Sequence, residues 1–156
     1  GRYDFTVAAN FNGTDVRKTP SLPTITNVSQ PPFLFDRGNV LTYEEGTPNQ
    51  KFVLNTDWSL GDWGATLKGT FYDSVLVPNN NPILDYNTGD TWIVDLEGRY
   101  KLGPAGLALG VNNLFDQYPN KTPALINSPS GSIGFPSYSP FGFNGRFLYA
   151  RVSVNW

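Results

Sequence analysis

Apolar and polar residues alternate strictly along two neighbouring stretches of the chain, 91–102 and 107–115. In the first stretch, every second residue is apolar, aromatic or glycine, and most of the residues between them are charged. Only the tight turn 103–106, Gly-Pro-Ala-Gly, separates the two stretches. A period of two is typical of β-strands with one apolar and one polar face. The pattern therefore predicts an antiparallel hairpin.

The same alternation predicts four more strands, at residues 3–11, 51–60, 63–72 and 148–156. Three segments between strands contain many turn-forming residues, have no sustained period and are predicted as loops, at 13–50, 78–90 and 117–144. No stretch predicts a helix. The expected fold is all-β, an antiparallel up-and-down meander of about six strands.

The lengths of the connections alternate as well. The joins after the second and fourth predicted strands are short, whereas those after the first, third and fifth are long. Consecutive antiparallel strands therefore place both short turns at one end of the sheet and all three long loops at the other.

Aromatic residues of the apolar parity gather near both ends of the predicted strands. Those at the short-turn end are Tyr3, Trp58, Trp63, Tyr100 and Trp156, and those at the long-loop end are Phe11, Phe52, Phe71, Trp92 and Phe115. At about 3.3 Å per residue and a strand tilt of about 40°, the two rows are ~20 Å apart. Outer-membrane β-barrels have an apolar band of about 25 Å between two aromatic girdles, with short periplasmic turns and long outer loops. The pattern favours such a barrel, with these residues as its membrane girdles and outer-membrane lipid against its apolar face.

A soluble barrel or sandwich, with the same apolar face turned inward, is the alternative interpretation. Alternation alone does not separate the two, but a soluble core would scatter its aromatic residues in depth. The smallest membrane barrels have about eight strands. We therefore expect the chain to be part of a longer protein.

Two motifs carry a resemblance to a known family. The run 106–119 contains Asn-Asn-Leu-Phe-Asp followed by Tyr-Pro and resembles the penultimate strand of TonB-dependent outer-membrane receptors. The end of the chain, 148–156, resembles the C-terminal strand of that family, with Trp156 where phenylalanine is commoner. The proline-containing segment 46–51 is similar to the family's entry into a strand.

The resemblance implies that 1–156 is the C-terminal part of an outer-membrane barrel domain of about 22 strands. It implies earlier barrel strands, an N-terminal plug and a segment that contacts the TonB complex, all upstream of this chain. It also implies the outer membrane of a Gram-negative bacterium as the location, and a C-terminal strand that the barrel-assembly machinery recognises.

Charged residues of the polar parity are expected to face the lumen of the barrel: Lys68, Asp95, Glu97, Arg99 and Arg151. Asp95 and Glu97 also have the spacing of the carboxylate pair in an inverting glycosidase. Because basic residues share their face, a lumenal charge ladder in contact with water or a plug is the favoured interpretation. Three apolar or aromatic residues break this polar pattern, namely Ile93, Phe147 and Tyr149.

Six aromatic residues of the predicted loops are candidates for ligand binding: Tyr43, Tyr86, Tyr118, Phe135, Tyr138 and Phe141. They could instead pack the loops against one another. In the functional interpretation, some of them line an outer vestibule for a siderophore, cobalamin or carbohydrate.

The composition limits the chemistry. The chain has no cysteine and no histidine, so neither a zinc site nor a histidine-based catalytic triad can be assembled within it. A net charge of -2 without a basic cluster argues against nucleic acid as a partner. Four acidic loop residues could ligate a hard cation, but their spacing does not resemble that of an EF-hand: Asp36, Glu44, Glu45 and Asp85. We expect no enzyme activity, no cofactor and no metal.

We expect the chain to form part of the barrel wall and outer loops of a receptor for energy-coupled uptake. A passive outer-membrane channel or adhesin-type barrel is the second hypothesis. The third is a secreted soluble β-module that binds glycans through its loop aromatics.

Overall fold

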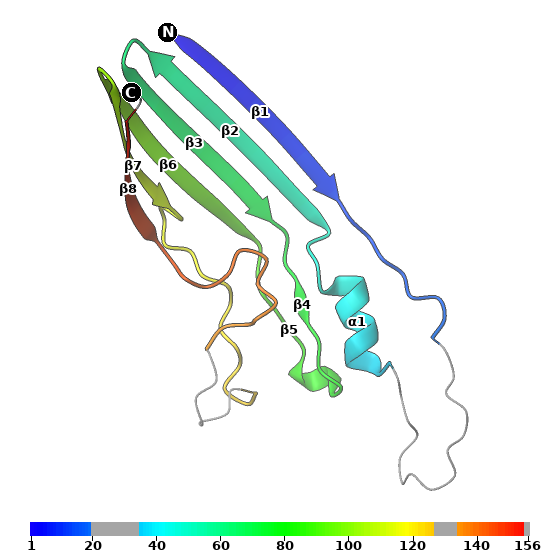
Figure 1. The fold of residues 1–156 in the computed structure, drawn as a ribbon. Helices are drawn as coiled ribbons and strands as arrows, with labels where there is room; N and C mark the ends of the chain where they lie inside the picture. The colour runs from blue at the N-terminus through cyan, green and yellow to red at the C-terminus, as the bar shows by residue number, and fades with distance from the viewer. Residues whose placement is uncertain (20–34, 127–133, 155–156) are drawn as a thin grey trace, which may run out of the picture.

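The structure, a computed structural model, describes residues 1–19, 35–126 and 134–154. Six strands form one antiparallel sheet in the order β1-β2-β3-β6-β7-β8 (Figure 1). Their bounds are β1 Arg2–Phe11, β2 Gln50–Leu60, β3 Trp63–Tyr72, β6 Thr91–Leu102, β7 Ala105–Asn112 and β8 Phe147–Val154. The predicted meander is therefore confirmed. The sheet is not closed into a barrel, because β1 and β8 form opposite edges.

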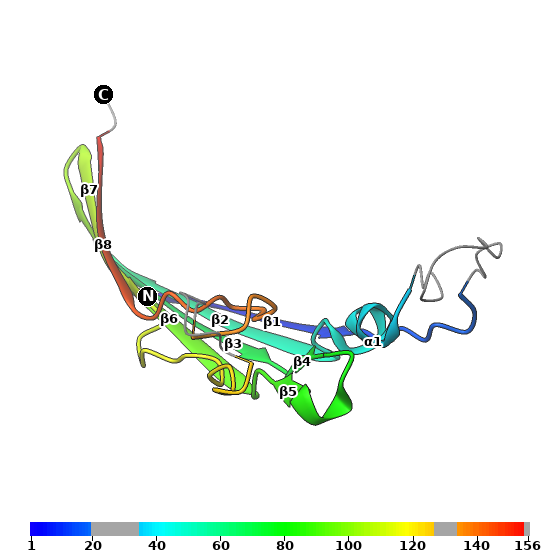
Figure 2. The same cartoon turned by 90° about the horizontal axis from the view of Figure 1, so that it is seen from below.

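The connections are sorted to the two ends of the sheet as predicted. The β2–β3 and β6–β7 turns lie at one end, and the strand ends that the three long connections join lie at the other (Figure 1). Figure 2 shows that the sheet is curved, with β7 and β8 rising away from the plane of β1, β2 and β3.

The strand register gives the sheet two chemically different faces. One row of facing residues runs Leu67, Leu96, Val111 and Leu148 across β3, β6, β7 and β8. We call the face that carries this row the apolar face. A second row runs Asp57, Thr66, Glu97, Gly110 and Tyr149 across β2, β3, β6, β7 and β8. This row defines the polar face.

The apolar face is uncovered. Its side chains at Leu67, Leu109 and Val152 are 49%, 70% and 67% exposed. Within residues 1–19, 35–126 and 134–154, the only buried hydrophobic residues are Val75 and Ala108. The described part of the chain thus has no closed hydrophobic core.

The prediction that the chain has no helix is wrong. An α-helix, α1 (Arg37–Glu45), lies in the segment 13–50 that was predicted as a loop. The connection between β3 and β6 also has structure of its own. It contains the short strands β4 (Leu76–Val77) and β5 (Tyr86–Asn87) around a 3-10 turn, η1 (Pro82–Leu84). Helix α1 has no buried residue, so it lacks the apolar stripe that would have marked it in the sequence. Among the described residues, no helix is long and apolar enough to cross a membrane.

Strand β7 ends three residues earlier than predicted. Asn113 adopts a left-handed backbone conformation with φ 52°. Its side chain accepts a hydrogen bond from the Gln117 N–H and donates one to the Gln117 carbonyl, both at 2.8 Å. Such local side-chain-to-backbone bonds compete with the strand ladder. Phe115 is consequently outside the strand and 61% exposed.

Candidate functional site

One half of the hydrogen-bond network on the polar face joins β2, β3 and β6. Asp57 accepts hydrogen bonds from the Thr66 hydroxyl at 2.6 Å and from the Arg99 guanidinium at 2.5 Å. The side chains of Arg99 and Asp57 are 36% and 34% exposed, so the pair is only partly shielded from water. This half of the network ties three strands together through side chains.

The other half joins β6, β7 and β8. The carboxylate of Glu97 accepts a hydrogen bond from the Tyr149 hydroxyl at 2.9 Å and pairs with Arg151 at 3.2 Å. Gly110 faces Glu97 on one side and Tyr149 on the other, and a Cβ added to Gly110 would collide with the Tyr149 ring. The tyrosine therefore reaches across β7 because the intervening residue is glycine. This arrangement explains one of the aromatic residues that broke the polar pattern.

The five predicted lumenal charges do not form one continuous ladder. Glu97 and Arg151 are directly bonded, and Arg99 lies 3.9 Å from Glu97. Asp95 instead accepts the Asn113 backbone N–H at 2.9 Å. Lys68 faces Asp95 in the β3–β6 register and its side chain is exposed. Asp95 and Glu97, the carboxylate pair considered for glycoside hydrolysis, are thus held by different partners.

Aromatic residues at the long-loop end of the apolar face form a continuous row. Ring centroids are 5.8 Å apart for Phe11 and Phe52, 5.9 Å for Phe52 and Phe71, and 5.5 Å for Phe71 and Trp92. These separations lie within the range of attractive ring–ring contact. Phe115 does not join the row, because β7 ends before it.

At the short-turn end, the same face carries two separate ring pairs. Tyr3 and Trp58 have centroids 6.5 Å apart, and Trp63 and Tyr100 have centroids 4.5 Å apart. Trp156, the remaining residue predicted for this row, lies outside the described residues.

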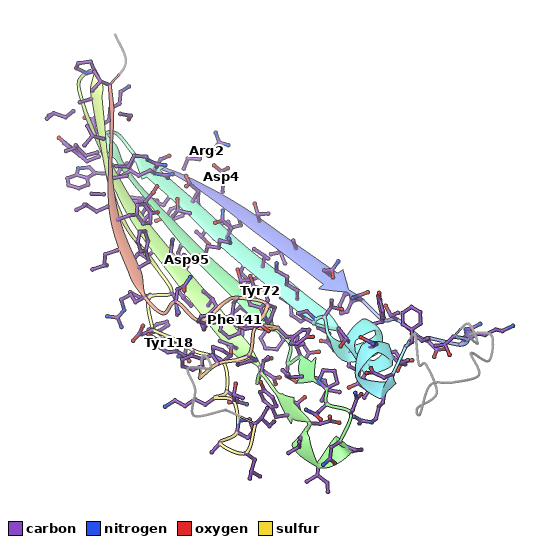
Figure 3. All side chains as sticks on the ribbon, turned by 60° about the horizontal axis from the view of Figure 1, so that its bottom comes forward. Arg2, Asp4, Tyr72, Asp95, Tyr118 and Phe141 are labelled. Carbon is purple, nitrogen blue, oxygen red and sulfur yellow. The ribbon has the colours of Figure 1, made fainter. Side chains whose placement is uncertain are left out.

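The loop aromatics that were predicted to bind ligand are divided among several contacts. Tyr118 stacks on Phe135, and Phe135 on Phe143, with centroids 5.4 and 6.2 Å apart. Figure 3 shows Phe141 beside Tyr72 of β3, where the ring centroids are 5.7 Å apart. The negative charge of Asp116 raises the pKa of the Tyr118 hydroxyl.

Two of the other three loop aromatics have contacts of their own. Tyr43 packs against Phe35 at 6.2 Å, and the Tyr86 hydroxyl lies 3.2 Å from that of Thr122. Tyr138 is 43% exposed. The ring and hydroxyl contacts found in the described part of the chain thus do not join the six residues into one group.

Polar contacts fasten α1 to the β4–β5 hairpin. Arg37 forms an ion pair with Asp85 at 2.6 Å and donates to the Asn79 carbonyl. Asp36 caps α1 by accepting the Asn39 N–H at 2.8 Å and accepts the Asn80 amide at 2.8 Å. The bond from Arg37 holds the pKa of Asp85 below its ordinary value.

Three of the four acidic loop residues considered as cation ligands accept hydrogen bonds from other parts of the chain. Asp36 and Asp85 take part in the junction just described, and Glu44 accepts the Val16 N–H at 2.9 Å. No group of three or more acidic residues suited to a metal ion occurs in the described ranges.

A cleft of about 340 Å³ opens on the polar face where β6 continues beyond the ends of β7 and β8. Its lining includes Ile93, Asp95, Asn112, Phe141, Asn144 and Phe147. The sequence analysis named Phe141 as a candidate for ligand binding and Asp95 as a lumenal charge, but it did not bring them together in one site or single out Asn112 and Asn144. The signal that pointed to it was the break in the polar alternation at Ile93 and Phe147.

No family model matches the chain, and the comparisons with curated proteins and with solved structures find no match either.

Proposed function

We propose that this chain supplies part of the wall and outer loops of a TonB-dependent outer-membrane receptor. The receptor would take up a scarce ligand, a siderophore, cobalamin or carbohydrate, with energy delivered through the TonB complex. The observation that carries the proposal is the exposed apolar face between two sets of aromatic residues. Large uncovered apolar surfaces mark contact with a protein partner or a membrane.

The strand edges support a membrane wall that other strands complete. In hydrocarbon every backbone N–H and C=O must be paired, so an open edge is costly there. Strands β1 and β8 each have a neighbour on one side only in the described sheet. We propose that earlier strands of the same receptor pair with both edges, and that the polar face lines the lumen beside the plug.

The sequence motifs narrow the proposal to this receptor family. The run 106–119 and the C-terminal strand carry the resemblance, and the barrel-assembly machinery would recognise the latter. Deletion of residues 154–156 from the full-length protein is expected to abolish its assembly in the outer membrane. Normal assembly of the deleted protein would contradict this part of the proposal.

Conductance separates a receptor from a passive channel. A plugged receptor is closed to ions, whereas a passive channel has an open lumen. We therefore expect full-length protein in planar bilayers bathed in potassium chloride to show no steady open conductance. A stable conductance would favour the passive channel.

Behaviour in water separates the membrane barrel from a soluble glycan-binding module. The exposed face at Leu67, Leu109 and Val152 predicts aggregation without detergent or lipid. A compact, detergent-free monomer would contradict the membrane proposal and favour the soluble module.

A further inference from the structure

We propose that the polar-face cleft between β6, residues 112–117 and residues 141–147 binds a neutral sugar ring. The inference rests on the proposed function, because the cleft lies on a transport route only if the polar face lines a lumen. It names a ligand class and a binding site, where the proposed function leaves three ligand classes open.

The cleft is a consequence of unequal strand lengths. The β7–β8 ladder ends at the pair Asn112 and Phe147, whereas β6 begins at Thr91. Beyond that ladder the chain follows β6 briefly, since the Leu114 N–H donates to the Val94 carbonyl at 2.7 Å. The bonds between Asn113 and Gln117 close a turn that ends this run along β6. The polar side of β6 at Ile93 is therefore left without a neighbouring strand on this side.

The chain then returns over the opening through two glycines in the left-handed region. Gly142 has φ 75° and Gly145 has φ 69°, and both line the cleft. A Cβ added to Gly145 would also collide with the Tyr118 hydroxyl. The backbone here is thus shaped to pass close to the cleft, with Phe141 placed above β3 by its contact with Tyr72.

The lining combines exposed ring surface with uncharged amides. Phe147 is 60% exposed although it occupies a polar-face position, and its ring lies 6.4 Å from Tyr149 in a stacked orientation. The amides of Asn112 and Asn144 each offer donors and an acceptor, and the Asp95 carboxylate offers acceptors. A sugar ring matches both features, because its C–H groups pack on the negative face of an aromatic ring while its hydroxyls both donate and accept.

The charges of the cleft argue against an anionic ligand. Asp95 is the charged residue in the lining, and its carboxylate is tied on one side by the Asn113 N–H at 2.9 Å. The basic residues Arg99 and Arg151 belong to the network around Asp57 and Glu97 instead. A volume of about 340 Å³ lies at the small end of ligand pockets, which span about 300–1,000 Å³, so it suits one ring better than a large chelate.

The test is saturation-transfer NMR on the full-length protein in phosphatidylcholine vesicles. The probes are the methyl glycosides of glucose, galactose, mannose and N-acetylglucosamine. We expect at least one of them to give transfer signals from its ring protons. Phe147→Ala is expected to weaken binding about tenfold, and Phe147→Trp to restore it. Asp95→Asn keeps an acceptor for the Asn113 N–H and is expected to weaken binding less than Phe147→Ala does.

The matched control is Phe5→Ala, which removes an exposed strand phenylalanine from the opposite face of the sheet. It is expected to leave sugar binding unchanged. Absence of signals from all four glycosides, or an affinity that Phe147→Ala leaves unchanged, would overturn the inference. Selective binding of protonated glucosamine that Asp95→Asn abolishes would overturn it in favour of a cation site.

Tryptophan quenching by brominated phosphatidylcholine in the same vesicles separates the two proposals. Quenching without sugar signals overturns the ligand inference alone. Sugar signals without quenching support the site and contradict the membrane proposal.

Discussion

The two faces of the six-stranded sheet satisfy their side chains in opposite ways. On the apolar face, Phe5, Leu109 and Leu148 are at least 70% exposed, so most of their surface is not covered by the described chain. On the polar face, Asp57 and Glu97 find their partners within the sheet, on neighbouring strands. A soluble sheet of this kind normally shows the reverse, with its apolar side chains packed together and its charges in water.

The contrast shows which face depends on the surrounding medium for its stabilisation. The polar face is stabilised by contacts whose geometry the sheet itself fixes. The apolar face has ring contacts, such as that of Trp63 with Tyr100, and is stabilised most when its surface leaves water. The arginine and glycine substitutions below compare the two faces directly, and the ion-pair and acid predictions test the polar contacts.

A charge placed on the apolar face should lower the free energy of unfolding more than the other substitutions do. Leu67 lies midway between Trp63 and Phe71 along β3. Leu67→Arg is expected to lower the free energy of unfolding from lipid vesicles by about 2–4 kcal/mol, the penalty of arginine at the bilayer midplane. Denaturant titration of the reconstituted protein measures it.

The control for Leu67→Arg is Thr6→Arg, which places the same charge on the polar face at the middle of β1. It is expected to change the free energy of unfolding by less than about 0.5 kcal/mol. Equal costs for the two substitutions would contradict the difference between the faces.

Glycine-to-alanine substitutions should also change stability differently on the two faces. Gly110 lies beneath the Tyr149 ring on the polar face, whereas nothing lies within 4 Å of a Cβ added to Gly98 on the apolar face. Gly110→Ala is expected to destabilise the sheet by about 1–3 kcal/mol through overpacking. Gly98→Ala is expected to stay within about 0.5 kcal/mol of the wild type. A neutral Gly110→Ala would mean that Tyr149 does not cross β7.

The ion pair between Arg99 and Asp57 should show a measurable coupling. A double-mutant cycle with Arg99→Ala and Asp57→Ala is expected to give about 1 kcal/mol, because both groups are one-third exposed. The comparison pair is Arg2 and Asp4 at the β1 edge, 77% and 51% exposed, for which a coupling near zero is expected. A larger coupling at the edge pair would reverse the ranking.

The junction of α1 with the β4–β5 hairpin should loosen in acid. Arg37 lowers the pKa of Asp85, so the ion pair stabilises the folded junction above the ordinary aspartate pKa of about 3.9. That stabilisation is lost as the pH falls through the lowered pKa, when Asp85 becomes protonated. The Asn79 N–H donates to Asp85 at 2.7 Å, so its protection against amide exchange is expected to fall there, and Asp85→Asn should remove that loss of protection. Unchanged protection in acid would contradict the role of the pair.

Much of the sheet was predictable because alternation is a direct signature of a strand with two unlike faces. The strands, the sorting of turns and loops, and the pairing of rings such as Phe52 with Phe71 follow from that period. Helix α1 was missed because it buries no side chain and so has no apolar stripe. Its cap, Asp36, was visible in the sequence but was considered only as a cation ligand.

The cleft and the early end of β7 were not predictable from periodicity. Asn113 ends the strand through bonds to Gln117, and such bonds depend on a backbone turn that the sequence pattern does not encode. The cleft then arises from the unequal ends of β6, β7 and β8. The sign of the cleft in the sequence was the presence of two apolar residues, Ile93 and Phe147, at polar-face positions.

The orientation of the faces can be measured directly with spin labels. Because residues 1–156 contain no cysteine, a cysteine introduced among them carries the only label in this part of the protein. In reconstituted full-length protein, labels at Leu67, Leu109 and Val152 are expected to collide with oxygen dissolved in lipid, and labels at Lys68 and Ser153 with a water-soluble nickel complex. If the first three labels collide with nickel, or are shielded from both reagents, the apolar face does not meet lipid and the account fails.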